Sequence, residues 1–173
     1  MNGMVEELLA FARGEVTLLI TKHFLKDYFN TLEMEFSAQV EGKDVSLEMK
    51  VGDRGYAFFD GSKIKRCLSN LFRNALEAVA SMENRVITVC VEGDEEYVRF
   101  SVSDTGPGIP ERIRDTLFDE FVTHGKSNGT GLGLAIVNRV VTEHGGEVMV
   151  ESEAGNGSCF TLVIPRDPGQ EAH

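Results

Sequence analysis

The sequence predicts an α/β fold, specifically a two-layer α/β sandwich with a mixed sheet. Segments of helical and strand periodicity alternate along the 173 residues, without the regular βαβ repeat of an all-parallel sheet. The last two strand-like segments are separated only by the turn at residues 153–157, so they can pair as a hairpin. Apolar residues make up 42% of the chain, which is too many for a disordered protein and enough for one domain with a substantial core.

The first third of the chain contains a helix end, an ambiguous segment and two strands. Apolar residues recur at helical spacing over residues 1–13, and Gly14 follows as a stop signal. Residues 16–34 are apolar but mixed in pattern, and their secondary structure stays open. Strand-like runs follow at 45–51 and 55–59, separated by a Gly-Asp-Arg-Gly turn.

The strongest helical signal covers residues 62–82. A stripe at 3-4 spacing predicts its buried face: Ile64, Leu68, Leu71, Ala75 and Val79. At about 100° per residue, a polar sector lies nearly opposite this stripe, and it contains Lys63, Asn70, Asn74 and Glu77.

The remaining elements follow in order. Strands are predicted at 85–92 and 97–104, then a loop-rich region at 105–131, a helix at 132–144, and strands at 147–152 and 159–164. The helix ends on Gly145-Gly146, so His144 is expected at its C-terminus.

Charge and composition exclude several classes of protein. The 17 basic against 28 acidic residues give a formal net charge of −11, which argues against binding of nucleic acid and against direct contact with an anionic membrane. The apolar runs are too short to span a membrane, and we expect no signal peptide. The three widely spaced cysteines are expected to be core residues in a reducing compartment. We therefore expect a cytoplasmic domain.

A carboxylate ends the strand at 97–104. By the period of two, Asp104 continues a row of core positions, which is costly for a carboxylate unless a donor meets it. The amino group of a purine is such a donor, and Gly106 and Gly108 would let the backbone approach a flat ligand. An Asx turn at the strand end explains the same residue equally well.

Two amides share a face of the helix at 62–82. Asn70 and Asn74 are one turn apart, and an Asn oxygen is a suitable ligand for Mg²⁺, which usually completes its shell with phosphates and water. The alternative is a solvated polar face.

A glycine-rich segment opens the helix at 132–144. Residues 129–134, Gly-Thr-Gly-Leu-Gly-Leu, offer unpaired N–H groups and a positive dipole end to a phosphate, although they match neither a Walker A nor a dinucleotide motif. The preceding residues 118–128 are typical of a lid, which Phe121 could anchor and from which Lys126 could reach a phosphate. A flexible loop with a surface lysine is the simpler alternative.

These segments, in this order, strongly resemble the ATP-binding catalytic domain of bacterial sensor histidine kinases, in the gyrase–chaperone–kinase ATPase superfamily. The resemblance covers roughly residues 40–165 and implies a Bergerat-type fold with the helices on one face of the sheet. The family boxes correspond to residues 70–78 (N box), 104–109 (first glycine box), 117–121 (F box), 129–134 (second glycine box) and 155–158 (third glycine box).

The resemblance implies ATP and Mg²⁺ as ligands and assigns roles to residues. Asn70 and Asn74 would be catalytic, with Asn74 as the metal ligand, and Asp104 would contact adenine. Ser158 stands where the family usually has a Thr near the adenine. The other implied nucleotide-binding residues are Gly106, Gly108, Ile109, Phe121, Lys126, Gly129, Thr130, Gly131, Leu132, Gly133 and Leu134.

Asn70 distinguishes among branches of the superfamily. Gyrase-like ATPases and anti-sigma-factor kinases carry a Glu at this position as a base that activates water or a serine hydroxyl. Asn cannot take up a proton, whereas a histidine acceptor already presents a nitrogen lone pair at neutral pH. The residue therefore favours a histidine kinase over the alternatives, an anti-sigma-type serine kinase or a catalytically inactive nucleotide-binding module.

The acceptor histidine is expected on another domain. None of the four histidines has a His-Glu/Asp-x-x-x-Pro context. Residues 1–14 resemble the end of the second dimerisation helix, 15–168 the catalytic domain, and 169–173 a disordered tail. We expect a monomeric fragment of a homodimeric parent, which supplies the phosphoacceptor domain and contacts a response regulator. Whether a membrane anchors this parent stays open.

Overall fold

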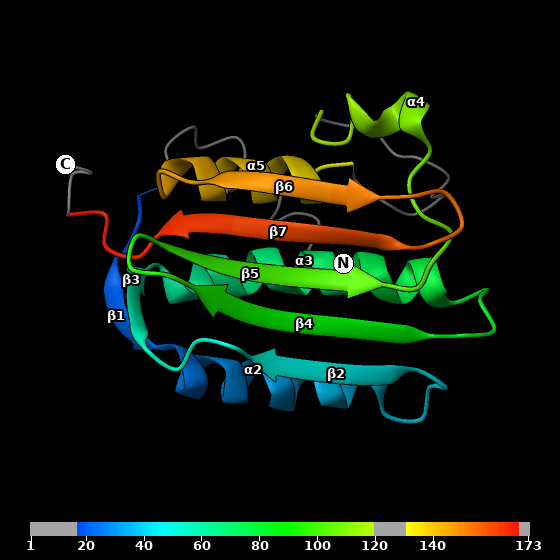
Figure 1. Cartoon of the computed structure of the whole chain (residues 1–173), viewed down its shortest axis with the longest axis horizontal. Coiled ribbons are helices and arrows are strands. Elements are labelled where there is room, and N and C mark those ends of the chain that lie inside the picture. The colour runs from blue at the N-terminus through cyan, green and yellow to red at the C-terminus, as the bar shows by residue number, and fades with distance from the viewer. Residues whose placement is uncertain (1–16, 120–130, 170–173) are drawn as a thin grey trace.

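The computed structural model describes residues 17–119 and 131–169. Figure 1 shows a sheet with its long helices packed against one face. In chain order the elements are β1 (Thr21–Phe24), α2 (Leu25–Val40), β2 (Ser46–Val51), β3 (Tyr56–Phe59), α3 (Gly61–Val79), β4 (Val86–Gly93), β5 (Tyr97–Asp104), α4 (Glu111–Arg114), α5 (Gly133–Glu143), β6 (Glu147–Ser152) and β7 (Ser158–Pro165).

The main sheet has five strands in the order β2-β4-β5-β7-β6. β2 pairs with β4 in parallel, and the other neighbours are antiparallel, so the sheet is mixed as predicted. β6 and β7 form the expected hairpin. The short strands β1 and β3 form a separate antiparallel ribbon at one end of the molecule (Figure 1). With α2, α3 and α5 behind the main sheet, the two-layer α/β sandwich is confirmed.

The core lies between α2, α3, α5 and the main sheet. All five apolar positions of the predicted α3 stripe are at most 3% exposed, which confirms the helix and its orientation. α3 begins one residue before the predicted start because Asp60 caps it by accepting a hydrogen bond from the backbone N–H of Lys63 at 3.0 Å. Phe36 of α2 stacks on Phe72 of α3, with ring centroids 4.1 Å apart.

The ambiguous segment at 16–34 contains the whole of β1 and the first part of α2. Its middle is β1, and its second half begins α2, which continues to Val40. The buried face of α2 consists of Leu25, Phe29, Leu32 and Phe36. Because the strand leads directly into the helix at Phe24, the apolar pattern of this segment combines strand periodicity with helix periodicity, and neither dominates.

In the described part of the loop-rich region, residues 105–119 and 131, lies a short helix that the sequence pattern did not indicate, α4. The predicted helix end at 1–13, the lid positions Phe121 and Lys126, and the loop positions Gly129 and Thr130 all lie outside the described residues. The proposed domain boundaries stay predictions. All three cysteines are free, and burial raises the pKa of the Cys67 thiol to about 12. In the described ranges, no helix is both long and apolar enough to cross a membrane.

Candidate nucleotide-binding site

The site is organised along one row of α3. Asn70, Asn74 and Ala78 follow one another at four-residue spacing, so they lie on successive turns of the same side of the helix. At a rise of 1.5 Å per residue the row is about 12 Å long. Its first end meets the start of α5, and its second end meets the loop that follows β5. The row therefore connects two predicted binding segments that are far apart in the sequence.

At the second end, the Asp104 carboxylate has a donor on each oxygen. Its Oδ1 accepts the backbone N–H of Gly106 at 2.8 Å, and its Oδ2 accepts the hydroxyl of Ser158 at 2.7 Å. Asp104 and Ser158 meet because they are paired across β5 and β7. The Asx turn and the ligand-binding role are thus compatible, because each carboxylate oxygen keeps a second lone pair.

Gly106 makes the contact between this loop and α3. A Cβ added to Gly106 would lie 2.8 Å from the Cβ of Ala78 and 2.6 Å from Oδ1 of Asp104. Both distances are far below van der Waals contact, so the loop can lie this close to the helix only with glycine here. Gly106 is buried beside the Asp104 carboxylate.

The loop after β5 is also tied to the β6–β7 turn. The backbone N–H of Ile109 donates to the Ser152 hydroxyl at 2.7 Å, and that hydroxyl donates to the carbonyl of Gly157 at 2.9 Å. Gly108 and Gly157 have φ of +75° and +84°, and a Cβ on either would collide with a backbone carbonyl of the facing segment. The first and third glycine boxes are therefore one packed unit.

At the first end of the row, α5 begins beside Asn70. Gly131 has φ of +69°, Leu132 is fully buried, and Gly133 starts the helix. A Cβ added to Gly133 would lie 4.0 Å from the Asn70 side chain. The first N–H groups of a helix have no acceptor within the helix, and they carry its positive dipole end, so this turn suits a phosphate. Leu134, one residue on, is half-buried and packs against the core.

Asn70 departs from the expected location opposite the core. It is only 5% exposed, because the side of α3 that carries it is covered at the start of α5. Its Oδ1 accepts a hydrogen bond from the Arg73 guanidinium at 3.1 Å. Its Nδ2 has no hydrogen-bond partner within residues 17–119 and 131–169. A buried donor in this condition costs about 1–3 kcal/mol, which a phosphate oxygen at the α5 N-terminus would recover.

Asn74 is half-buried, one turn from Asn70 toward the Asp104 end. Its position between the two ends suits a ligand for a cation that also binds phosphates. The described part of the chain contains no cluster of three or more His, Cys, Asp or Glu residues that could hold a metal ion. An amide oxygen, phosphate oxygens and water together form a ligand set that Mg²⁺ accepts.

Sequence reasoning missed Arg73 and Ser152. Arg73 is three residues from Asn70 on the same helix, a spacing that signals a contact, but the role of the bond depends on α5. Ser152 ends β6, and no local pattern links it to Ile109. The structure brings Asp104, Gly106 and Ser158 together at one end and Asn70 and Gly133 at the other.

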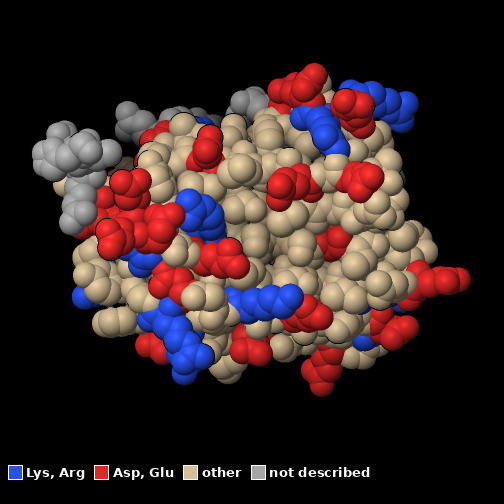
Figure 2. All heavy atoms as spheres, viewed as in Figure 1, with Lys and Arg blue, Asp and Glu red and all other residues tan. Residues whose placement is uncertain are grey.

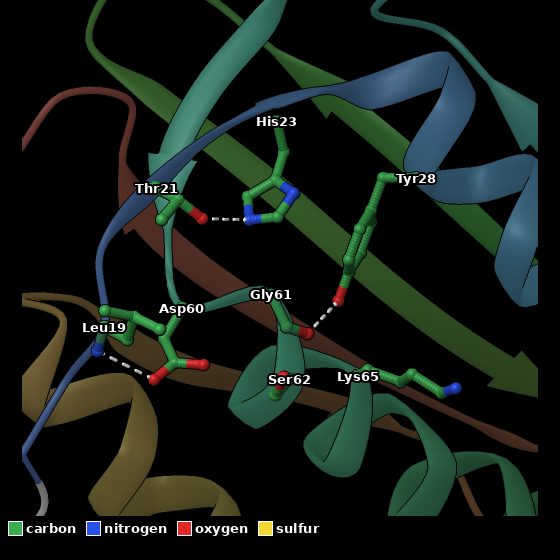
Figure 3. A pocket seen from close by; sticks show the side chains of 8 residues that line it. All are labelled: Leu19, Thr21, His23, Tyr28, Asp60, Gly61, Ser62 and Lys65. Carbon is green, nitrogen blue, oxygen red and sulfur yellow. Dashed lines mark hydrogen bonds between the residues drawn. The ribbon is translucent and has the colours of Figure 1, made fainter.

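Two hollows in the described part of the chain lie elsewhere. One, of about 220 Å³, is lined by residues that include His23, Tyr28 and Asp60 (Figure 3). Beside Asp60 lies His144, the C-cap of α5, so the expected place of this histidine is confirmed. Its Nε2 accepts the backbone N–H of Asp60 at 3.0 Å, and its Nδ1 donates to the carbonyl of Val140. Because Nε2 accepts this N–H, the ring is neutral, and burial lowers the pKa of His144 in agreement.

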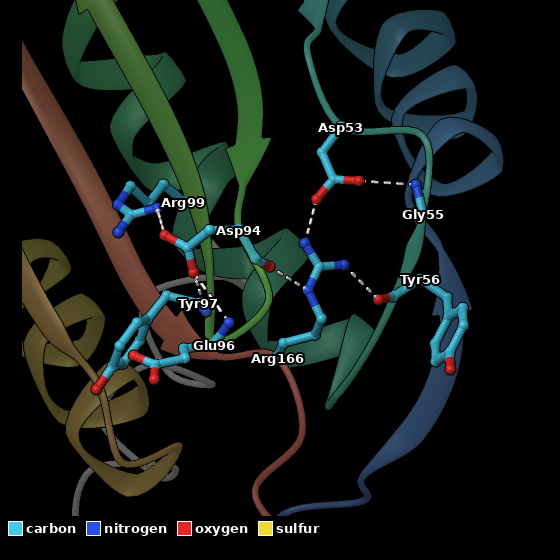
Figure 4. Close-up of polar contacts among 8 residues, drawn as sticks. All are labelled: Asp53, Gly55, Tyr56, Asp94, Glu96, Tyr97, Arg99 and Arg166. Carbon is cyan, nitrogen blue, oxygen red and sulfur yellow. Dashed lines mark hydrogen bonds and ion pairs between the residues drawn. The ribbon is translucent and has the colours of Figure 1, made fainter. Parts of the chain in front are cut away.

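The other hollow, of about 620 Å³, is lined by residues that include Asp53, Asp94 and Arg166. Figure 4 shows the polar contacts of Arg166. Arg166 donates to the carbonyls of Asp94 and Tyr56 and pairs with Asp53, so its role is to tie the C-terminal strand to two loops. Charged side chains of both signs are scattered over the open face of the sheet in Figure 2, with uncharged surface between them. Neither hollow includes any of the site residues that the sequence predicted.

The chain is similar in sequence to known proteins. Residues 59–168 match the model of the family described as histidine kinase-, DNA gyrase B- and HSP90-like ATPases. The sensor histidine kinase ZraS of Escherichia coli is 40% identical over 166 residues, which cover 95% of this chain and 35% of that protein. Sporulation kinase E of Bacillus subtilis is 28% identical over 95% of this chain and 22% of its own length. The chain thus spans about a third or less of these two relatives.

Solved structures agree with the sequence relatives. The catalytic domain of the histidine kinase ThkA superposes with a TM-score of 0.76 at 30% identity, covering 86% of this chain and 99% of that one. Full-length ShkA in complex with AMPPNP gives a TM-score of 0.80 at 29% identity, covering 94% of this chain and 35% of that one. The fold is that of histidine kinase catalytic domains. The chain belongs to the histidine kinase-, DNA gyrase B- and HSP90-like ATPase family.

Proposed function

We propose that the chain is the ATP-binding kinase domain of a two-component sensor histidine kinase. It transfers the γ-phosphoryl group of ATP to a histidine on a separate dimerisation domain of the same parent protein. The observation that carries this proposal is the row of Asn70, Asn74 and Ala78, which joins the Asp104 carboxylate to the N-terminus of α5. An extended nucleoside triphosphate needs this combination, a base-binding end and a phosphate-binding end on one rigid element.

Each end has a defined task. Asp104, held by Gly106 and Ser158, accepts a hydrogen bond from the amino group of adenine, and Gly106 lets the ring lie against the loop. The N–H groups at Gly131–Gly133 hold the phosphates. Asn74 offers its Oδ1 to Mg²⁺, which supplies charge neutralisation when bound. On the sequence alone, Phe121, Lys126, Gly129 and Thr130 complete the phosphate side.

Asn70 favours a histidine over water or serine as acceptor. In the transfer, a bond forms between an imidazole nitrogen and the γ-phosphorus while the bond from that phosphorus to the ADP oxygen breaks, and its electron pair leaves with ADP. An imidazole nitrogen has a free lone pair at neutral pH and needs little help from a base. Asn70 cannot act as a base, so the activation of water or of a serine hydroxyl lacks its proton acceptor.

The partners follow from this role. ThkA has been solved in complex with the response regulator TrrA, and we infer that the parent of this chain also passes its phosphoryl group to a response regulator. We expect the chain to be monomeric and cytoplasmic and the parent to be a homodimer. The chain itself should require neither nucleic acid nor a membrane.

Phosphotransfer in trans tests the proposal. The chain is incubated with γ-labelled ATP, Mg²⁺ and the separately expressed dimerisation domain of its parent, with Asn74→Ala as the inactive control. We expect acid-labile, base-stable label on the supplied domain and none on the chain alone. Acid-stable phosphoserine on a partner would establish a serine kinase instead. Label on a histidine of the isolated chain would contradict the separate acceptor.

A further inference from the structure

Arg73 occupies a position that neither the motifs nor the nucleotide contacts above explain. It lies on α3, and its Nη2 is 3.1 Å from the Oδ1 of Asn70. We propose that Arg73 is a positioning residue that fixes the orientation of the Asn70 amide, so that the amide presents its Nδ2 as a hydrogen-bond donor to the transferring phosphoryl group. This inference rests on the proposed function, and it adds a residue and a direction of hydrogen bonding to it.

The chemistry of arginine determines which way the amide faces. A guanidinium has five N–H donors and no acceptor, so the Asn70 atom that faces it must be the carbonyl oxygen. The two ends of an Asn amide are otherwise hard to tell apart in a structure. Here the assignment follows from the partner, and it directs Nδ2 away from Arg73.

The surroundings of Nδ2 indicate what it should bind. Asn70 is only 5% exposed, and the described residues offer Nδ2 no acceptor. A Cβ built on Gly133 would lie 4.0 Å from Nδ2 and 4.0 Å from Nη2 of Arg73, so both groups lie beside the first turn of α5. The missing ligand is therefore an acceptor at the helix N-terminus, where anions are favoured. A phosphate oxygen satisfies both conditions.

The opposite orientation would fail. With the amide turned over, Nδ2 would face the Arg73 donors and Oδ1 would face the phosphate oxygens, so donor would oppose donor and acceptor would oppose acceptor. Arg73 therefore selects the productive orientation before the nucleotide binds. During transfer the charge of the phosphoryl group spreads over its equatorial oxygens, where a donor fixed in place is most effective. The effect of Arg73 should accordingly fall on kcat more than on the affinity for nucleotide.

Two variants of Arg73 and one control separate positioning from charge. Arg73→Met removes both the donor and the charge, and we expect about a tenfold loss of kcat for transfer, the order expected when one hydrogen bond to a charged group is lost. Arg73→Gln keeps an N–H donor for Oδ1 without the charge, and it should restore most of the rate. Arg66→Met, two turns earlier on the same helix, is the matched control and should leave kcat unchanged.

A double-mutant cycle with Asn70→Ala tests whether Arg73 acts through Asn70. We expect Arg73→Met to cause little further loss of kcat in the Asn70→Ala background, because the group that it positions is gone. Losses that multiply would show that Arg73 acts on the phosphates directly and would overturn the inference. Failure of Arg73→Gln to restore the rate above that of Arg73→Met would overturn it as well.

A measurement that needs no turnover distinguishes failure of the positioning role of Arg73 from failure of the proposed function. The side-chain NH₂ resonances of Asn70, assigned by their loss in Asn70→Ala, are followed by ¹⁵N NMR as Mg²⁺ and a non-hydrolysable ATP analogue are added. We expect a large shift in the wild-type chain and a smaller, broadened one in Arg73→Met. Equal shifts in both would refute the positioning role, whereas absent histidine transfer with a normal shift would refute only the proposed function.

Discussion

Replacing Asp104 by asparagine tests the adenine end of the site while sparing its fold. In the native chain each carboxylate oxygen already accepts one donor, at 2.8 Å from Gly106 and 2.7 Å from Ser158. The amide introduced by Asp104→Asn can keep both contacts, because its oxygen can accept the Gly106 N–H while its NH₂ donates to the Ser158 hydroxyl, which is also an acceptor. The substitution therefore removes the negative charge that strengthens a hydrogen bond from the adenine amino group, and it leaves one accepting oxygen in place of two.

The size of the effect follows from this loss. A hydrogen bond to a charged group contributes about 1.5–3 kcal/mol, and each 1.4 kcal/mol is a factor of about ten in affinity. We expect Asp104→Asn to raise the Kd for ATP by about 10- to 100-fold, and to reduce the preference for ATP over GTP.

Calorimetric titration with a non-hydrolysable ATP analogue and Mg²⁺ provides the measurement, and a thermal melt verifies that the fold is intact. Asp44→Asn, which changes an exposed carboxylate before β2, is the matched control and should bind as the wild type does. An unchanged Kd in Asp104→Asn with an intact fold would refute the assignment of this carboxylate to adenine.

Three further predictions concern packing, orientation and pH. Gly106→Ala should lower the free energy of unfolding, measured by urea denaturation, by about 1–3 kcal/mol, because the added Cβ would lie 2.8 Å from the Cβ of Ala78. The double variant Gly106→Ala, Ala78→Gly should recover part of this loss. If it recovers none, the contact with Ala78 is not the cause. Ser158→Ala should weaken ATP binding, measured by calorimetry, because the Asp104 carboxylate loses one of its two donors. Ser158→Thr keeps a hydroxyl and should bind ATP as the wild type does. Equal affinities of the wild type and both variants would contradict the role of the hydroxyl. Burial lowers the pKa of His144, so between that lowered pKa and the ordinary value of 6.5 the unfolded chain binds more protons than the folded one. Stability should therefore fall as the pH drops from about 7 toward 5, by at most about 1.4 kcal/mol per pH unit from this residue, and the same slope in His144→Gln would exclude it as the source.

The sequence predicted the elements whose periodicity is local and unmixed. α3 and the β6–β7 hairpin are examples, because the buried stripe of α3 and the turn at 153–157 are complete within a short window. The segment at 16–34 could not be assigned, since β1 leads directly into α2 inside it. The parallel pairing of β2 with β4 joins strands on either side of α3, and no local pattern specifies it.

The site was predictable in its composition but only partly in its environment. Asp104, Gly106 and Ser158 were named from their motifs, and the structure brings them into contact. The burial of Asn70 was not predictable from α3 alone, because it depends on where α5 packs. The role of the hydrogen bond from Arg73 to Asn70 depends on the same contact between α3 and the start of α5, which lies far away in the sequence. The lid positions lie outside the described residues and stay predictions.

The most direct test of the account is to locate the bound nucleotide by NMR. Mg²⁺ and a non-hydrolysable ATP analogue are added to the ¹⁵N-labelled chain, and the shifted resonances are mapped onto the structure. We predict that the largest shifts fall along α3 and at its two ends, at Asn70, Asn74, Gly106, Gly133 and Ser158. Shifts that instead gather around Asp60 or Arg166, where the two hollows lie, would contradict the central claim that the face of α3 between Asp104 and α5 binds ATP.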